Sequence, residues 1–179
     1  MHKVNRRGQS ALWCTASGGH VETLRLLIEA RADLDQPEGT TPLAVAAGAG
    51  HDAVVNALLA AGAQLVISLL VVACKQGHAE VASTLLAARC STDCRGENGL
   101  SPLTAACLSG EVAVVQTLLS AGAAQNDLDG SGDSPLSTAC KAGHAEVVGC
   151  LLKSAADPNR LDGSGISPYQ KISNLWLGP

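Results

Sequence analysis

A short pattern that recurs along the chain constrains the fold more than any other feature. In residues 134–152 it reads S-P-L-S-T-A-C-K-A-G-H-A-E-V-V-G-C-L-L, two short apolar runs around a Lys-Ala-Gly-His break. Pro135 suits the first turn of a helix, and Gly143 suits a tight break between helices. We therefore expect a helix–turn–helix hairpin. Neither helix is long enough to be stable alone, so the hairpin needs neighbours.

The neighbours are further copies of the same pattern. The spacings between the Ser or Thr residues that open successive copies are 31, 27, 33, 33 and 33. A fixed period in this range is typical of stacked repeats. The opening residues are Ser10, Thr41, Ser68, Ser101, Ser134 and Ser167, and the breaks fall at Gly19-His20, Gly50-His51, Gly77-His78, Gly110-Glu111 and Gly143-His144.

The repeated residues resemble those of the ankyrin-repeat family. Residues 41–46 (T-P-L-A-V-A) and 134–136 (S-P-L) are similar to its T-P-L-H-x-A signature, and residues 77–81 (G-H-A-E-V) resemble its inter-helix turn. The resemblance covers almost the whole chain. It implies an all-α solenoid of stacked helix-turn-helix repeats with short β-hairpin fingers. The signature His is absent from every copy, and the residues in its place are Trp13, Ala44, Val71, Thr104 and Ser137.

This alignment divides the chain into repeats within one domain over residues 1–179. The repeats span about 5–35, 36–65, 66–94, 95–127 and 128–160, with a terminal half-repeat over 161–179. Helices are expected over 11–17, 21–30, 42–49, 52–61, 102–109, 112–121, 135–142 and 145–154, and fingers over 93–100, 127–133 and 159–166. Repeat three lacks six residues relative to its 33-residue siblings, which is the length of a finger. We expect a gap in the finger row there, where the stack bends or unfolds first.

Composition narrows the class of protein. Phe is absent and aromatic residues make up 2% of the chain, which suits thin, closely packed helices. The net charge is −4 without a basic block, so we expect no nucleic-acid partner. Residues 53–74 carry no charge and are long enough to imitate a membrane span. The repeat register instead favours two buried helices joined by a loop, and we expect no membrane insertion.

The cysteines indicate the compartment. Seven Cys is an odd number, and no secretion signal precedes them. We therefore expect a reducing, intracellular location, in the cytoplasm or the nucleus. Cys74, Cys107 and Cys140 share one column of the repeat. Stacked helices lie about 8–10 Å apart and a disulfide needs Cα atoms within about 7 Å, so these three are expected to be buried thiols.

Three motifs imitate reactive or metal sites. His-x-Glu at His20, His78 and His144 resembles part of the zinc-deaminase signature, but P-C-x-x-C is missing and the motif recurs with the repeat. Residues 90–94 (C-S-T-D-C) lack two further zinc ligands nearby. Residues 127–133 (D-L-D-G-S-G-D) open like a calcium loop, but its twelfth position is Thr138 rather than Glu. We expect no enzyme, metal or cofactor, and keep a zinc-dependent hydrolase or deaminase as a distant alternative.

The resemblance implies a monomeric scaffold or adaptor that binds a protein partner through a concave face, with no small-molecule substrate. The acidic finger tips favour a partner with a basic rim. The alternative is that the chain is the repeat segment of a larger protein, since residues 5–10 align with the inside of a finger. The candidate partner-binding residues are Trp13, Lys75, Gln76, Thr104, Leu108, Thr138 and Lys141 on the first helices, and Glu38, Glu97, Asn98, Asp129, Asp133 and Asp162 on the finger tips.

Overall fold

The protein is an elongated stack of helical hairpins. The computed structural model describes residues 5, 9–35, 40–66, 68–170 and 173. We call the leading helix of each hairpin the first helix and the other the second helix. The first helices are α1 (Ala11–Ser17), α3 (Pro42–Ala49), α5 (Leu69–Lys75), α7 (Pro102–Ser109) and α9 (Pro135–Ala142). The second helices are α2 (Val21–Glu29), α4 (Asp52–Ala60), α6 (Ala79–Ala87), α8 (Val112–Ser120) and α10 (Ala145–Lys153).

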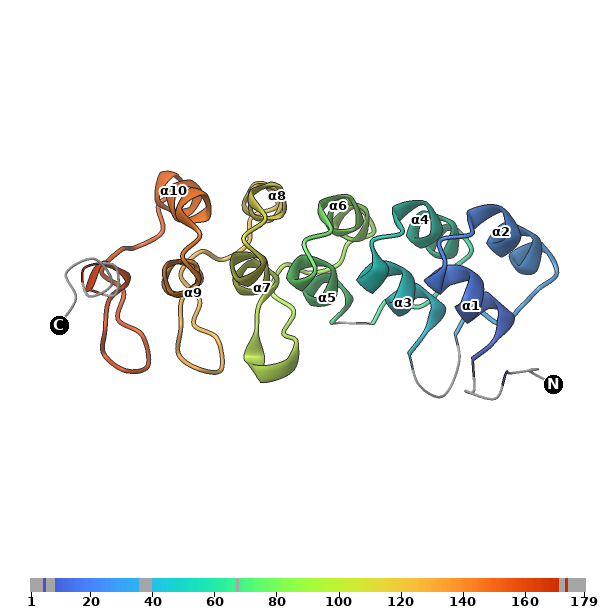
Figure 1. The fold of residues 1–179 in the computed structure, drawn as a ribbon, viewed down its shortest axis with the longest axis horizontal. Coiled ribbons are helices and arrows are strands. Elements are labelled where there is room, and N and C mark those ends of the chain that lie inside the picture. Colours follow the sequence, from blue (N-terminus) through green and yellow to red (C-terminus); the bar gives the residue numbers. More distant parts are fainter. Residues whose placement is uncertain (1–4, 6–8, 36–39, 67, 171–172, 174–179) are drawn as a thin grey trace.

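The two kinds of helix form two parallel rows, with the chain ends at opposite ends of the stack (Figure 1). Every predicted first helix is found at its predicted bounds, and every predicted second helix ends one residue early. The all-α solenoid is thus confirmed. We call the fingers over 93–100, 127–133 and 159–166 the fourth, fifth and sixth fingers. A short 3₁₀ turn (Glu97–Gly99) lies in the fourth finger. The fingers are turns rather than β-hairpins, because the described residues contain no β-strand.

Four of the five Ser and Thr residues that open the complete repeats are helix N-caps, and three of these four are followed by proline. The Thr41 hydroxyl accepts a hydrogen bond from the Ala44 amide at 3.1 Å, and Ser10, Ser101 and Ser134 do the same for their third helical residues. Each bond satisfies an amide that has no partner within the helix. The proline that follows needs no such partner. The Ser/Thr-Pro pair therefore fixes where a first helix begins.

Two columns of leucine form the core. One leucine of every first helix and one of every second helix is at most 2% exposed. Small residues fill the space between the helix rows, because the five residues at one first-helix position are Ala or Cys and at most 5% exposed. The leucine columns are Leu12, Leu43, Leu70, Leu103 and Leu136, and Leu24, Leu58, Leu85, Leu118 and Leu151; the small column is Ala16, Ala47, Cys74, Cys107 and Cys140.

A histidine in the turn of one repeat bonds the first helix of the preceding repeat. The Nε2 atom of His78 lies 3.1 Å from the Gly48 carbonyl oxygen, and His51 and His144 make the same contact. Because a carbonyl can only accept, Nε2 carries the proton. Each ring also covers a left-handed glycine: a Cβ on Gly50 would lie 2.7 Å from His78. The Gly-His pair thus joins two repeats as well as two helices.

Repeat four carries Glu111 at the histidine position and uses another residue for the bond. Glu111 packs over Gly77, where a Cβ would lie 2.6 Å from its Cγ atom. The Ser109 hydroxyl donates to the Cys74 carbonyl oxygen at 3.2 Å. Repeats three and four are therefore still joined at the turn, by packing from one side chain and a hydrogen bond from another.

The last three fingers bond to one another. Each is closed by one backbone pair, as in the Asp129 amide to Asp133 carbonyl bond of 2.9 Å. The Gly130 amide donates to the Asn98 carbonyl at 3.0 Å, and the Gly163 amide donates to the Gly132 carbonyl at 2.8 Å. Arg95 adds an ion pair with Asp127 at 2.7 Å. These contacts unite the C-terminal fingers into one row.

The finger row is interrupted before repeat three, as predicted. Five residues separate Ala63 from the start of α5 at Leu69, and the described ones form no projecting loop below α5 (Figure 1). Without a finger, Ser68 has helical φ and ψ and its side chain does not cap α5. Helix α5 also packs more closely on α7 than on α3. Repeats two and three are nevertheless joined on the other side by His78 and by Thr84, whose hydroxyl donates to Asp52 at 2.5 Å.

Three second helices end in a left-handed residue that is not glycine. The φ angles of Arg31, Arg89 and Ala155 are 57°, 65° and 66°, whereas Gly62 and Gly122 hold the equivalent positions in repeats two and four. A side chain is strained in this region, so these ends are less favourable than their glycine counterparts.

We expect His78→Ala to affect cooperativity more than His144→Ala. Both remove one interrepeat hydrogen bond, worth about 0.5–1.5 kcal/mol. His78 joins repeats two and three, where the finger bond is missing, whereas repeats four and five keep the Gly130–Asn98 bond. In urea denaturation His78→Ala should broaden or divide the transition, and His144→Ala should only lower its midpoint. If both variants changed the slope of the urea transition equally, the interface between repeats two and three would not be the weaker one.

Gly130→Ala should destabilise the finger row. A Cβ at this position would lie 2.3 Å from the Asn98 carbonyl oxygen, which is backbone and has little room to move. The control is Gly149→Ala, inside α10, where a Cβ would meet nothing within 4 Å. We expect the control to stabilise by about 0.5–1 kcal/mol and Gly130→Ala to lower the melting temperature measured by circular dichroism. A Gly130→Ala chain as stable as the wild type would refute the finger contact.

Candidate functional site

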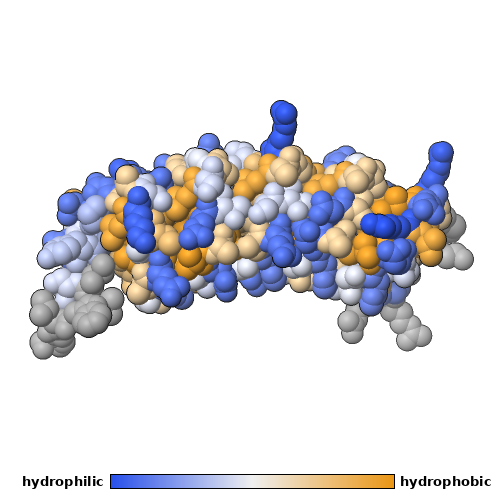
Figure 2. Space-filling model, turned by 90° about the horizontal axis from the view of Figure 1, so that it is seen from above, coloured by the Kyte–Doolittle hydropathy of each residue, from blue (hydrophilic) through white to orange (hydrophobic). Residues whose placement is uncertain are grey.

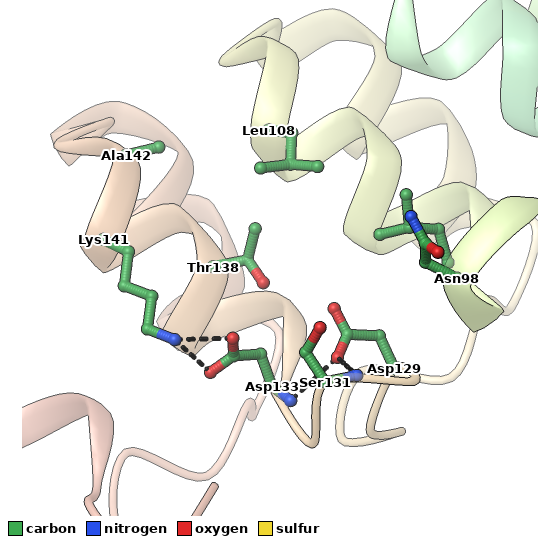
Figure 3. Close-up of a pocket in the computed structure, with 9 residues that line it drawn as sticks. Asn98, Leu108, Asp129, Ser131, Asp133, Thr138, Lys141 and Ala142 are labelled. Carbon is green, nitrogen blue, oxygen red and sulfur yellow. Dashed lines mark hydrogen bonds and ion pairs between the residues drawn. The ribbon is translucent and has the colours of Figure 1, made fainter. Parts of the chain in front are cut away.

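The surface is hollowed between repeats four and five. The hollow is a depression of about 410 Å³ bounded by the fourth and fifth fingers and by α7 and α9 (Figure 3). Leu100 and Leu108 supply apolar wall, and Asp129 and Thr138 supply polar groups. The full lining is Asn98, Leu100, Leu108, Asp129, Ser131, Asp133, Thr138, Lys141 and Ala142.

The charges in this depression are unequally compensated. Lys141 Nζ lies 2.6 and 2.8 Å from the two carboxylate oxygens of Asp133. Among the described residues no cation pairs with Asp129: its Oδ1 atom accepts from the Ser131 amide at 2.8 Å and the Asp133 amide at 2.9 Å. These bonds hold the finger closed and use one of its two oxygens. The depression therefore keeps one carboxylate without a cationic side chain beside it.

Several predicted partner-binding residues of the first helices are accessible. Lys75, Gln76 and Leu108 are exposed on α5 and α7, and Trp13 is half-buried on α1. We call these four residues, with Val72 and Lys141, the first-helix face. Glu97 and Asn98 are exposed in the fourth finger.

The expected exposure was wrong for four of the candidate residues. Thr104 is 0% and Thr138 6% exposed, because the neighbouring repeats cover these positions of the first helices. Asp133 and Asp162 are 9% and 8% exposed, because the finger folds back toward its helix. Asp162 Oδ1 closes its finger by accepting from the Ser164 and Ile166 amides. Glu38 lies outside the described residues.

Sequence reasoning missed Leu100, Ser131, Ala142 and Val72. Leu100 is the residue before a helix cap, and Ser131 lies inside a finger, so neither position was counted as surface. Ala142 lies eight residues after Ser134, and Val72 lies four after Ser68. Both occupy counted positions, and the alignment contained the signal for them. Val72 is 37% exposed beside the missing finger.

The His-x-Glu motif serves the fold. The rings of His78 and His144 bond carbonyl oxygens of preceding repeats through Nε2, and each lies in a different turn of the stack. In the part of the chain that the structure describes, no three His, Cys, Asp or Glu residues come together in a way that could hold a metal ion. The geometry therefore gives the zinc alternative no support.

The calcium-like segment and the C-x-x-x-C segment also have structural contacts. Asp127 pairs with Arg95, and Asp133 pairs with Lys141, so these carboxylates already face cations. Cys94 is 9% exposed and Cys90 half-buried, and burial raises the pKa of both thiols. A raised pKa disfavours the thiolate that zinc binding or redox chemistry requires.

The predicted buried thiols are found. Cys74 and Cys107 are 0% exposed, Cys140 is 5% exposed, and none of the three forms a disulfide. Burial, with a smaller effect from Cys94, raises the pKa of the Cys74 thiol to about 12. Burial and the neighbouring Cys140 raise the pKa of Cys107 further above its ordinary value. These side chains act as small apolar residues in the core.

The fold is an α-solenoid of helical hairpins. The family described as ankyrin repeats (3 copies) matches residues 1–68 and 70–162. The chain belongs to the ankyrin-repeat family. A comparison with curated proteins gives no match. Among the helices that the structure describes, none is long and apolar enough to cross a membrane.

Alkaline pH should destabilise the fold through the buried thiols. In the unfolded chain they ionise near their ordinary pKa of 9.0, whereas folded Cys74 stays protonated to about 12. The stabilising effect is complete below pH 9 and is lost as pH rises toward 12, by up to about 1.4 kcal/mol per thiol and pH unit.

Urea denaturation in reductant at pH 8 and pH 10.5 measures this loss. Cys74→Ala/Cys107→Ala is the matched control, because Ala16 and Ala47 occupy the same position in repeats one and two. Its stability should fall less between the two pH values. An identical pH dependence in both chains would exclude the thiols as the cause.

Proposed function

We propose that the protein is a non-catalytic scaffold or adaptor that binds a protein partner through the first-helix face and the adjoining fingers. The supporting observation is that six of the candidate residues identified from sequence line one depression between repeats four and five. They come from two fingers and two first helices. Such convergence of apolar walls with a few polar groups is typical of binding surfaces.

The exposed residues suggest where binding energy is concentrated. Leu108 is 45% exposed beside the depression and is a candidate apolar anchor. Trp13, at the other end of the first-helix face, is a second candidate. Lys75 is a peripheral charge, which affects association rate more than affinity.

The opposite face is less suited to a continuous interface. Figure 2 shows the surface of the second helices, where hydrophilic residues divide the apolar surface into separate patches. Exposed leucines such as Leu26 and Leu152 lie there on different repeats. Scattered apolar residues are common on soluble proteins and do not by themselves mark a site.

We also infer the compartment of the protein and the charge of its partner. Cysteines that form no disulfide within the described part of the chain suit a reducing, intracellular compartment. The partner carries a basic rim, because carboxylates outnumber cations around the last three fingers. A chain acting as the repeat segment of a larger protein would use the same face.

An affinity capture from native lysate tests the proposed face. We expect Trp13→Ala/Lys75→Glu/Leu108→Ala to lose a partner that the wild type captures, because it removes two apolar anchors and reverses a charge. Lys141 is left unchanged, since a glutamate there would face the buried Asp133 carboxylate.

The matched control is Leu26→Ala/Lys153→Glu, an exposed leucine and an exposed lysine on second helices. This variant should retain the partner. Circular dichroism establishes beforehand that all three chains are folded. Loss from the control with retention by the first-helix variant would place binding on the second helices and overturn the proposal.

A further inference from the structure

We propose that the depression between repeats four and five receives an arginine side chain of the partner protein. This inference deepens the proposed function and rests on it. The proposed ligand is a cation whose planar head group carries several hydrogen-bond donors and whose stem is apolar. Three observations support it: the residual charge, a buried hydroxyl without a partner, and the apolar wall.

The charge of the depression calls for one cation. Its lining contains two carboxylates and one ammonium group, which leaves one negative charge. Lys141 is held by Asp133, so the uncompensated group is Asp129. The turn amides bond only Oδ1 of Asp129, and its Oδ2 atom makes no hydrogen bond with the described residues. A cationic donor can reach that oxygen without opening the finger.

Thr138 provides a second, independent polar group. It is 6% exposed, and among the described residues its hydroxyl has no hydrogen-bond partner. In that part of the chain no fully enclosed side-chain oxygen or nitrogen lacks a partner, so this hydroxyl is reached from the depression. Figure 3 shows Thr138 between Leu108 and the Asp129 turn. A hydroxyl that lines the depression can accept a hydrogen bond from a ligand that donates one.

The wall selects the stem. Leu100 and Leu108 line the depression, and apolar surface of this kind accepts the methylene groups of a long cationic side chain. Arginine fits better than lysine because its planar guanidinium can donate to a carboxylate and to further acceptors at fixed angles. Asn98, at the rim, offers another amide oxygen.

The next finger lacks this combination and provides a control. Asp162 closes the sixth finger with the same two amide bonds that Asp129 makes in the fifth, at 2.8 and 2.9 Å. Asp162 does not line the depression. Asparagine can accept the same amide bonds in such a turn. Asp129→Asn and Asp162→Asn therefore affect the same pair of amide bonds in their turns, and only Asp129→Asn alters the proposed site.

The test is a nuclear magnetic resonance titration of the ¹⁵N-labelled full chain with N-acetyl-L-arginine N-methylamide. We expect millimolar binding, reasonable for so small a ligand, with shifts concentrated at residues 129–133 and 138–141. The lysine analogue should bind more weakly, and the uncharged citrulline analogue should bind least. Asp129→Asn should weaken arginine binding about tenfold, the loss of a charge-assisted hydrogen bond. Thr138→Val should also weaken it, whereas Asp162→Asn should leave it unchanged.

Equal shifts with arginine and citrulline, or unchanged binding by Asp129→Asn, would overturn the assignment. So would an absence of shifts in the depression. Thermal unfolding of every variant separates lost binding from lost folding. The titration needs no partner protein, so it tests the arginine site separately from the scaffold function. If the titration showed no binding while the affinity capture still depended on the first-helix face, the arginine site would be wrong and the scaffold function would still hold.

Discussion

The stack depends on contacts between each inter-helix turn and the preceding first helix, and in three turns the contact is a histidine hydrogen bond. Helices of seven to nine residues are not stable alone, and their last carbonyls lack intrahelical partners. His51, His78 and His144 satisfy one such carbonyl each, and their rings cover the glycines that allow the turns. Repeat formation and repeat stacking are therefore one event, as expected for a solenoid stabilised by nearest-neighbour contacts.

The local signals explain why the helices could be predicted closely from sequence. A Ser or Thr cap followed by proline begins a first helix, and a left-handed glycine ends it, so both bounds are written in adjacent residues. The gap before repeat three followed in the same way from a simple difference in length. Such features need no knowledge of how the repeats pack.

The depression between repeats four and five could not be predicted from positions in the sequence, because it depends on contacts between repeats. Thr138 and Asp133 occupy positions that look exposed on an isolated repeat, but the neighbouring finger and helix cover them. The pairing of Asp133 with Lys141, and of Asp127 with Arg95, likewise depends on how fingers fold back. Only the three-dimensional arrangement separates the compensated carboxylates from Asp129.

The missing finger also affects how the sequence can change over time. Gly130 and Gly132 each lie against backbone of an adjacent finger, so a substitution there requires an adjustment in another repeat. Repeats four and five and the half-repeat must therefore vary in concert along this edge. Repeats one and two lie on the other side of the missing finger, so this steric constraint does not link them to the later fingers. The short third repeat thus leaves the fingers at the two ends of the stack without a shared steric constraint.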